Sequence, residues 1–443
     1  MIKITQLFDE KKFLEIREIF NTGNIADIAS MLEEVENQEQ STVLFKLLPK
    51  NKAAEVFAYL SPDKQQILVE SFSNKEISNI IQELYIDDAI DFIEEMPANV
   101  VERVLKNTDK ETRDIINTIL MYPENSAGSL MTIEFVDLKS NMTVQEAFAR
   151  IRRIGIDKET INTCYVTDST RILQGVVSVK TLLLSEPDTN IEKIMTTNFI
   201  YTQTGEDQEQ VAQMFRKYDI NALPVVDKEQ RLVGIITVDD IIDIIQEENT
   251  EDFQKMAAME PNADEYLITS VFTHFKKRIG WLLILMISSM LTGAIITAYE
   301  QAFLIIPALI GFIPMFMNTG GNSGTQASTL IIRGMAMGEI KLKDFFKVFL
   351  KEMRVALVVG LVLAIFNFFR IYLLNKDAVL ALVVAITLYF TVILAKLLGV
   401  ILPMAAKKFK LDPALMASPL ITTVVDTFSV MFYFFIASIL FNL

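Results

Sequence analysis

Long apolar runs dominate the chain between residues 271 and 443. One of them, ALVVGLVLAIFNFF, begins at Ala356 and is apolar on every side of a helix, which soluble proteins rarely tolerate. Because a helix needs about 20 mostly apolar residues to cross a bilayer, we predict an all-α membrane domain rather than a buried soluble bundle. Five spans are predicted, at about 279–298, 302–318, 348–370, 378–404 and 414–441.

Charge is divided unevenly along the chain. Residues 1–270 contain 26 Lys or Arg and 49 Asp or Glu, whereas residues 271–443 contain 15 and 7. The basic residues of the second part cluster before span one, between spans two and three, and between spans four and five. Since basic clusters mark cytoplasmic loops, we predict a multi-pass protein of the cell membrane with cytoplasmic N-terminal domains and an external C-terminus.

A repeat of short, equal units runs through residues 43–118. Its units, such as YLSPDKQQILVE and SFSNKEISNIIQ, have Pro, Ser, Asp or Asn near the start and continue as a short amphipathic run. These residues are typical of helix caps and first turns, so each unit predicts one short helix. Short stacked helices form a superhelix, and we predict an all-α superhelical domain over residues 1–125.

A second repeat, with strand-like runs, follows in residues 126–250. YVTDSTRILQGVVSVKTLL (165–183) aligns with PVVDKEQRLVGIITVDDII (224–242) at a fixed offset, so that Asp168 matches Asp227 and Gly175 matches Gly234. Both copies read as strand, turn, strand and helix start. The pair resembles tandem cystathionine-β-synthase (CBS) domains, an α/β unit that senses nucleotides in that family. We therefore predict a tandem CBS region over 126–245, divided into about 126–190 and 191–245.

The nucleotide motif of CBS domains is Gly, two apolar residues, Ser or Thr, and Asp three positions later. The second copy matches with Gly234, Thr237 and Asp240, whereas the first has Ser178 but Thr181 where Asp is expected. The resemblance implies at most one good nucleotide site, for a ligand such as ATP. It leaves open whether this pair binds a nucleotide.

Acidic residues recur at helical spacing in two separate places. In DDIIDIIQEENTEDF they follow every three or four residues, and in IDDAIDFIEEM Asp87 and Asp91 are four apart, with Glu55 on the same face of an earlier repeat. Either face alone is typical of a solvated helix. Two acidic faces on neighbouring modules repel unless cations lie between them, and carboxylate oxygens are preferred ligands of Mg²⁺ and Ca²⁺.

The last predicted span contains a carboxylate. In LDPALMASPLITTVVDTF, Asp412 opens the stretch and Asp426 stands within the span. Intramembrane acids usually face a cavity or an ion path, and a hydrogen bond between helices is the alternative role for Asp426. The polar stretch NTGGNSGTQAS (318–328) predicts a break in the helix at membrane depth. Its candidate pore groups are Asn322, Thr325 and Gln326, with helix packing by small residues as the alternative role.

Three motifs in order resemble the MgtE family of magnesium channels. They are YPENSAGSLMT (122–132), NTGGNSGTQAS and LDPALMASPLITTVVDT (411–427). The resemblance covers essentially the whole chain and implies a superhelical N domain, a CBS pair, a connecting plug helix over 246–270 and a five-helix membrane domain over 271–443. It also implies a homodimer in the lipid bilayer, with a pore on the two-fold axis lined by spans two and five.

The resemblance assigns roles to residues of this chain. The pore carboxylate falls on Asp426 and the cytoplasmic-side carboxylate on Asp412, and Thr422 and Asn322 are candidate partners of a largely hydrated Mg²⁺. In this hypothesis high cytosolic Mg²⁺ bridges the acidic modules and closes the pore, and low Mg²⁺ lets the modules repel and opens it. The implied regulatory ligands are Glu55, Asp87, Asp91, Glu209, Asp219, Asp240, Asp243, Glu248, Glu251 and Asp252.

Two other functions fit parts of the sequence. A transporter coupled to H⁺ or Na⁺ would also use Asp426, and a nucleotide-sensing membrane receptor would need only the CBS pair. An enzyme is not expected, because the only histidine, His274, lies at the membrane entry and no Ser/His/Asp, Cys/His, zinc or phosphate-loop constellation is present. Nucleic acid is not an expected partner.

Overall fold

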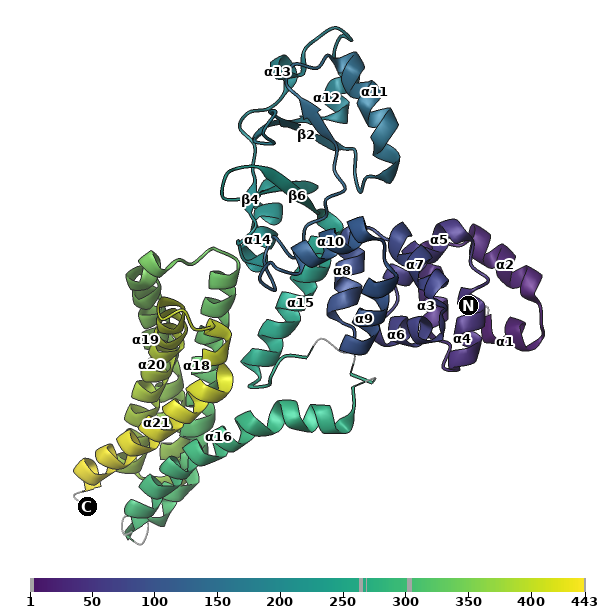
Figure 1. The fold of residues 1–443 in the computed structure, drawn as a ribbon. Helices are drawn as coiled ribbons and strands as arrows, with labels where there is room; N and C mark the ends of the chain where they lie inside the picture. The colour runs from purple at the N-terminus through teal and green to yellow at the C-terminus, as the bar shows by residue number, and fades with distance from the viewer. Residues whose placement is uncertain (1–3, 263–265, 268, 301–304, 442–443) are drawn as a thin grey trace. The chain divides into compact units, whose positions relative to one another are not determined.

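The computed structural model of the chain describes residues 4–262, 266–267, 269–300 and 305–441. The chain divides into two compact units, residues 1–244 and residues 245–443. Short helices come first along the chain, two small sheets follow, and long helices form the C-terminal part (Figure 1). The predicted order of an all-α, an α/β and a second all-α part is therefore confirmed.

Short helices build the first part of the chain (Figure 1). From α5 onwards they begin at equal intervals, at Lys50, Pro62, Asn74, Ile86, Ala98 and Lys110, which confirms the predicted helical repeat. The bounds are α1 Ile4–Asp9, α2 Phe13–Thr22, α3 Ile25–Glu33, α4 Gln38–Phe45, α5 Lys50–Ala58, α6 Pro62–Ser71, α7 Asn74–Glu83, α8 Ile86–Glu94, α9 Ala98–Asn107 and α10 Lys110–Ile119.

Local sequence explains where these helices begin. The side chain of Ser73 accepts from the backbone N–H of Glu76, whose carboxylate accepts from the N–H of Ser73, so both groups form a capping box. Asp109 accepts from two backbone N–H groups at the start of α10, and Pro62 occupies the first turn of α6. Each helix then buries an apolar stripe. The buried side chains of α5 to α9 include, in order, Phe57, Leu68, Ile77, Ile90 and Val104.

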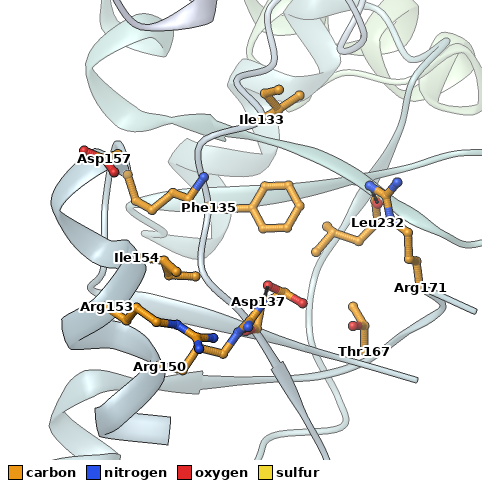
Figure 2. Close-up of a pocket in the computed structure, with 11 residues that line it drawn as sticks. Ile133, Phe135, Asp137, Arg150, Arg153, Ile154, Asp157, Thr167, Arg171 and Leu232 are labelled. Atoms are coloured by element: carbon orange, nitrogen blue, oxygen red, sulfur yellow. Dashed lines mark hydrogen bonds and ion pairs between the residues drawn. The ribbon is translucent and has the colours of Figure 1, made fainter. Parts of the chain in front are cut away.

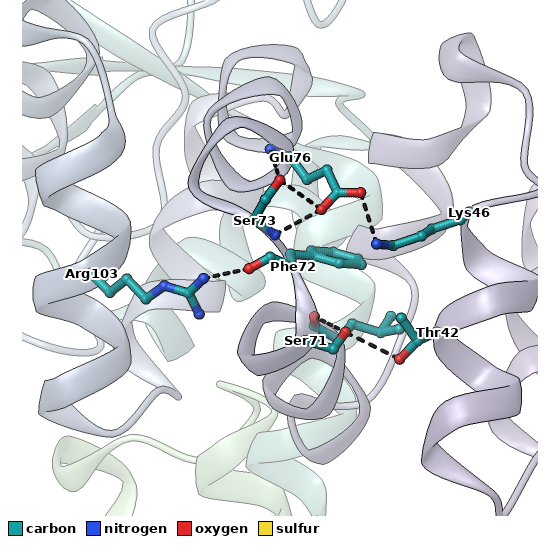
Figure 3. Close-up of polar contacts among 8 residues, drawn as sticks. Thr42, Lys46, Ser71, Phe72, Ser73, Glu76 and Arg103 are labelled. Atoms are coloured by element: carbon teal, nitrogen blue, oxygen red, sulfur yellow. Dashed lines mark hydrogen bonds and ion pairs between the residues drawn. The ribbon is translucent and has the colours of Figure 1, made fainter.

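Basic side chains donate hydrogen bonds to carbonyl groups at the C-terminal ends of earlier helices. Lys52 donates to the carbonyl oxygen of Gly23, just after α2, at 2.7 Å. Arg103 on α9 donates to the carbonyl oxygen of Val69 at 3.0 Å and to that of Phe72, just after α6 (Figure 3). A helix C-terminus carries unpaired carbonyl groups and a partial negative charge, so a cation there is favourable. The few cations of this acidic domain thus connect helices distant in sequence.

A second polar group connects α7 to the end of α4 (Figure 3). Lys46 Nζ lies 2.9 Å from Glu76 Oε1, and Ser73 donates to the same carboxylate. The hydrogen bond from Lys46, followed by that from the Ser73 backbone, lowers the pKa of Glu76 to about 2. The Lys46 and Glu76 side chains are 43% and 38% exposed, so the pair positions α7 more than it stabilises the domain.

Two three-stranded sheets follow, each with one parallel and one antiparallel pairing. Strands β2 and β3 of the first sheet recur as β5 and β6 of the second at the single offset that the sequence predicts, so the CBS repeat is confirmed. The bounds are β1 Asp137–Lys139, α11 Val144–Ile154, β2 Thr163–Thr167, β3 Leu173–Ser178, α12 Val179–Leu184, α13 Ile191–Ile194, β4 Thr202–Gln203, α14 Gln208–Tyr218, β5 Ala222–Val226 and β6 Leu232–Thr237.

The two CBS halves exchange their leading segments. Thr132, ahead of the first sheet, pairs with β6 of the second sheet, and Thr196, ahead of the second sheet, pairs with β3 of the first. A side chain on Gly234 would begin 2.8 Å from the carbonyl oxygen of Thr132, and one on Gly175 would begin 3.0 Å from that of Thr196. Both positions therefore need glycine for this close approach of two backbones.

The connecting helix differs from the prediction of 246–270 in both bounds. Helix α15 runs over Val238–Met256 and starts directly after β6, so one helix serves as the end of the second CBS domain and as the connecting helix. Residues 257–262 are not helical, in agreement with Pro261, which disfavours helix in the residue before it. Residues 263–265 and 268 of the predicted helix lie outside the described residues.

Long apolar helices form the second unit. Among the described residues, four segments are long and apolar enough to cross a membrane: Val271–Ala298, Leu342–Asn375, Ala378–Lys408 and Pro413–Phe441. The predicted five spans are therefore not confirmed, because the more polar α18 does not meet this criterion. The bounds are α16 Val271–Ala298, η2 Pro307–Phe312, α18 Ile313–Ala336, η3 Leu342–Asp344, α19 Phe345–Asn375, α20 Ala378–Lys408, η4 Pro413–Met416 and α21 Ser418–Phe441.

Two predictions about α18 are wrong. The predicted span 302–318 is not one helix, because the 3-10 helix η2 ends where α18 begins, and residues 302–304 lie outside the described residues. The stretch NTGGNSGTQAS does not break the helix but is helical throughout. Its glycines allow close packing: a side chain on Gly324 would begin 2.5 Å from Ile421, and one on Gly399 of α20 would begin 2.6 Å from the Gly324 carbonyl oxygen.

The apolar core of the second unit lies between α18, α20 and α21. It contains the buried side chains of Phe316, Leu388 and Tyr433. The Tyr433 hydroxyl donates to the carbonyl oxygen of Leu309 at 3.0 Å, which satisfies the hydroxyl and positions η2. Helix α16 instead exposes apolar side chains such as Ile287, as expected of a helix that faces lipid.

Replacing Arg103 by Met should loosen the contact between α6 and α9. The variant keeps the apolar stem but loses charge-assisted hydrogen bonds, which contribute about 1.5–3 kcal/mol each. Hydrogen–deuterium exchange of the full chain should therefore be at least about tenfold faster in α6 and α9. Lys106→Met, at an exposed basic position of the same helix, is the matched control. Equal exchange in the two variants would contradict the role given to Arg103.

Candidate functional site

Four carboxylates of the first unit interact where α8 meets the CBS pair. Asp87 and Asp88 lie on α8, Glu159 lies in the loop after α11, and Asp240 lies in the first turn of α15. Burial raises the pKa of Asp87 well above its usual range, and the nearby charge of Asp240 adds to the effect. Burial, then Asp240, raises the pKa of Asp88 to about 6 and that of Glu159 to about 8. Asp240 is thus the common centre of the cluster.

The raised pKa values have a consequence for stability. A carboxyl group whose pKa is higher in the folded state stabilises the fold at low pH, and that contribution is lost as the pH rises through the folded-state pKa. At neutral pH the negative charge of this acidic cluster therefore destabilises the fold, unless a bound cation neutralises part of it. Glu159 Oε2 is buried and has no hydrogen-bond partner among the described residues, so it is open to such a cation.

The oxygen-only donor set of this cluster fits a hard divalent cation. Among the described residues, no group of three or more His, Cys, Asp or Glu side chains is close enough to hold a metal ion directly. An ion held by this cluster would therefore keep part of its water shell, as Mg²⁺ usually does.

The structure brings only some of the predicted regulatory ligands into this cluster. Asp87 and Asp240 belong to it, and the exposed Glu55 is close enough for its charge to help raise the pKa of Asp88. Glu209 and Asp219 lie at the two ends of α14 and stay predictions. Asp91, Asp243 and Glu248 also stay predictions; Asp91 and Asp243 are exposed.

Asp88 and Glu159 were missed by the sequence analysis. Asp88 stands next to Asp87 in IDDAID, so a wider reading of the same acidic stretch includes it. Glu159 lies alone in a loop, and only the tertiary fold brings it to Asp240. No local pattern marks it.

The motif residues Thr237 and Asp240 are in contact. The Thr237 hydroxyl donates to Asp240 Oδ2 at 2.5 Å, and the corresponding hydroxyls of Ser178 and Thr181 lie 2.8 Å apart. Burial raises the pKa of Asp240 although the bond from Thr237 opposes the shift. Asp240 therefore belongs both to the nucleotide motif and to the acidic cluster.

A lysine separates the carboxylates at the end of the connecting helix. Lys255 Nζ lies 2.7 Å from Asp412 Oδ2 and also pairs with Glu251. Burial, followed by the charge of Asp412, raises the pKa of Asp252 to about 6. Met256 packs against a small apolar cluster on α18 and η4. The structure thus brings Glu251, Asp252 and Asp412 together, but around an ammonium group that the sequence analysis overlooked within the acidic stretch.

Asp426 lies on α21, one turn after Thr422. Its Oδ1 is buried and has no hydrogen-bond partner among the described residues. Thr422 and Thr423 each donate their hydroxyl to the carbonyl oxygen of Pro419 at 2.9 Å. Their protons are thus used within the helix, while their oxygen lone pairs stay available to water or a cation.

Helix α18 presents an exposed polar face. Asn318, Asn322 and Gln326 follow one another every four residues and are exposed, and Asn322 Nδ2 donates to Asn318 Oδ1 at 2.8 Å. A polar face of this kind is not expected to face lipid. The other side of α18 packs on α21, where a side chain on Gly321 would begin 2.7 Å from Thr422.

Lys396 on α20 and Glu352 on α19 form an ion pair that the sequence analysis missed. Lys396 Nζ lies 3.8 Å from Glu352 Oε2, and the side chains are only 6% and 12% exposed. A single buried charge inside apolar helices is costly, so each residue depends on the other. The sequence could have indicated this pair, because Glu352 and Lys396 carry opposite charges within two consecutive predicted spans.

The fold and these sites define a multi-pass membrane protein with an acidic superhelix and a tandem CBS unit. The MgtE intracellular N domain matches residues 23–125, the CBS domain matches 191–247, and the MgtE divalent cation transporter domain matches 313–436. The chain belongs to the MgtE family of transporters, which confirms the resemblance drawn from its motifs.

Relatives and solved structures agree with this assignment. The chain is 35% identical to the magnesium transporter MgtE of Thermus thermophilus, over 98% of this chain and 99% of the relative. It is 30% identical to the magnesium transporter MgtE of Bacillus subtilis, over 97% of each. A crystal structure of the cytosolic domain of the Mg²⁺ channel MgtE in complex with ATP is similar with a TM-score of 0.52 and 36% identity, over 55% of this chain and 99% of that chain.

Acidification should stabilise the contact of α8 with the CBS pair. Without Mg²⁺, a fall from about pH 8 to about pH 6 protonates part of the cluster and removes repulsion, because the pKa values of Asp88 and Glu159 are raised to about 6 and about 8. Protection factors of α8 in hydrogen exchange should therefore be higher at the lower pH, and Glu159→Gln should reduce the difference. Protection that rises with pH would contradict this.

Breaking the buried ion pair should destabilise the second unit. Lys396→Met or Glu352→Gln alone leaves one uncompensated buried charge, at a cost of about 3–5 kcal/mol. The double variant removes both charges and should recover most of that loss. Thermal unfolding in detergent compares the three variants, and a double variant less stable than either single one would contradict the pairing.

Proposed function

We propose that the chain is a magnesium channel of the cell membrane. The observation that carries this proposal is Asp426, whose buried Oδ1 is unpartnered among the described residues and lies within an apolar helix. Mg²⁺ gives up its waters reluctantly, so a carboxylate in a wet path suits a largely hydrated ion. Similarity to relatives named magnesium transporters supports this cation.

The polar face of α18 supports a homodimer. Asn318, Asn322 and Gln326 would be costly against lipid, and a second copy of the chain around a water-filled path would shelter them. A two-fold axis beside α18 and α21 would bring two copies of Asp426 near each other, and facing carboxylates require a shared cation or proton. Thr422 would contact the water shell of the ion, and Asp412 would lie at the cytoplasmic mouth.

Cytosolic Mg²⁺ is the proposed closing ligand. A ligand shifts an equilibrium only through different affinities for its two states. Carboxylates that converge, as Asp87 and Asp240 do, offer a cation site that separated modules lack. High Mg²⁺ therefore favours the compact, closed state, and low Mg²⁺ favours the open state. The other proposed regulatory ligands are Glu55, Asp91, Glu209, Asp219, Asp243, Glu248, Glu251 and Asp252.

ATP is the proposed ligand of the CBS pair. Thr237 and Asp240 match the motif, and a related cytosolic domain has been crystallised in complex with ATP. Because Asp240 also belongs to the acidic cluster, occupation of the motif would change the charge available to a cation there. Nucleotide and Mg²⁺ would then influence each other's binding.

The proposed domains are 1–125, 126–245, a connecting region from 246 to 270 and a membrane domain over 271–443. The N-terminal domains would be cytoplasmic and the C-terminus external, because the basic clusters before α16, between α18 and α19, and after α20 fall on alternate connections if α18 also crosses the membrane.

Mg²⁺ flux into reconstituted vesicles tests the proposal. Asp426→Ala should lower the flux at least about tenfold, and Asp426→Asn should also lower it, because a negative charge attracts the hydrated cation and a neutral amide does not. Glu339→Gln, an exposed acid of the same unit, is the matched control. Normal flux in both Asp426 variants would contradict the proposed pore site. Flux that follows voltage and needs no H⁺ or Na⁺ gradient favours a channel over a coupled transporter.

A further inference from the structure

A pocket lined mostly by the first CBS domain, together with Leu232 of β6, carries four basic side chains (Figure 2). It encloses about 530 Å³ between α11, the loop after α11, the β2–β3 turn and the start of β6. Neither Thr237 nor Asp240 lines it, so the pocket is separate from the nucleotide motif. Its charged and apolar lining includes Phe135, Arg150, Arg153, Lys158, Arg171 and Leu232.

Basic side chains outnumber acidic ones in this lining, although the surrounding unit is strongly acidic. Arg150 is already compensated, because its Nε donates to the Asp137 carbonyl oxygen at 2.6 Å and its guanidinium pairs with the Asp137 carboxylate. Within the described ranges, the side chains of Arg153 and Lys158 make neither a hydrogen bond nor an ion pair. Two cations therefore remain available, and Asp157 is the one remaining acid among the described residues that line the pocket.

Arg171 approaches the pocket from the side opposite Arg153, with Phe135 between them (Figure 2). Its Nη2 donates to the Leu232 carbonyl oxygen at 3.0 Å, which holds the guanidinium at the pocket. Its left-handed φ of 70° recurs at Gln230, the corresponding residue of the second copy, where φ is 64°. The turn geometry therefore belongs to the fold, whereas the arginine is specific to the first copy.

Apart from Thr167, the remaining lining is apolar. Phe135 and Leu232 form a floor between the basic groups, and an adjoining cavity of about 770 Å³ shares Ile133, Phe135 and Arg171 with the pocket. Small-molecule sites typically combine an apolar lining with a few convergent polar groups in about 300–1,000 Å³. A ligand with a highly charged anionic end and an apolar or planar end matches this arrangement.

We propose that the pocket binds the phosphate groups of a small phosphorylated ligand, with Arg153, Lys158 and Arg171 as the anion contacts. Guanidinium groups match phosphate oxygens in pairs, and a phosphate group has enough charge and oxygens for several cations at once. The apolar part of the ligand lies on Phe135 and Leu232. The site goes beyond the proposed Mg²⁺ path and beyond the nucleotide motif at Thr237.

Binding of ATP and of inorganic pyrophosphate to the purified full chain tests the site. In Mg²⁺-free buffer, isothermal titration calorimetry should show both probes binding, and Arg153→Ala combined with Lys158→Ala should weaken pyrophosphate binding at least about tenfold, while ATP binding at the Thr237 motif persists. Arg152→Ala is the matched control, because Arg152 lies over the Phe148 ring and does not line the pocket. Binding in this control should be unchanged.

Thr237→Ala separates the two candidate sites. Thr237 does not line the basic pocket, so pyrophosphate binding should be unaffected by Thr237→Ala and weakened by changes in the basic pocket. The proposal is overturned if wild-type chain binds no pyrophosphate, if the double variant binds it normally, or if Arg152→Ala weakens it equally. Mg²⁺ flux is measured separately, so failure of this site leaves the proposed channel standing.

Discussion

Repulsion between carboxylates is the constraint on which the rest of this structure depends. Asp240 sits at the centre of one acidic cluster, and its neighbours Asp88 and Glu159 have pKa values raised by burial and by that charge. Asp252 and Asp412 are a second pair of interacting carboxylates, at the end of α15. Such arrangements persist only if protons, cations or basic side chains share the charge.

The chain supplies its own cations at selected places. Arg103 and Lys52 donate to carbonyl oxygens in the last turn of a helix or just after it, and so connect helices of the superhelix without neutralising its acidic face. Lys255 lies between carboxylates at the end of the connecting helix, and Lys396 compensates Glu352 inside the membrane unit. The charges that act most strongly on the pKa values of Asp88 and Glu159 are all acidic, so that cluster is the one best suited to an ion from solution.

Local repeats predicted much of the fold, because the relevant signals are short in sequence. The even spacing of the helix starts and the single offset between the two strand pairs are both confirmed. The connecting helix was misplaced because nothing in the sequence separates it from the second CBS domain. The stretch 318–328 was expected to break a helix, yet tight packing of its glycines against α20 and α21 overrides their low helix propensity. Glu159, Lys255 and Lys396 acquire their roles only through tertiary contacts.

Hydrogen exchange of the full chain with and without Mg²⁺ tests the central claim most directly. The claim is that a divalent cation shares the charge around Asp240, so millimolar Mg²⁺ should slow exchange in α8 and at the start of α15, while Na⁺ at equal ionic strength should not. Asp240→Asn should weaken the Mg²⁺ response. Exchange that Mg²⁺ leaves unchanged, or that Na⁺ slows equally, would contradict the account.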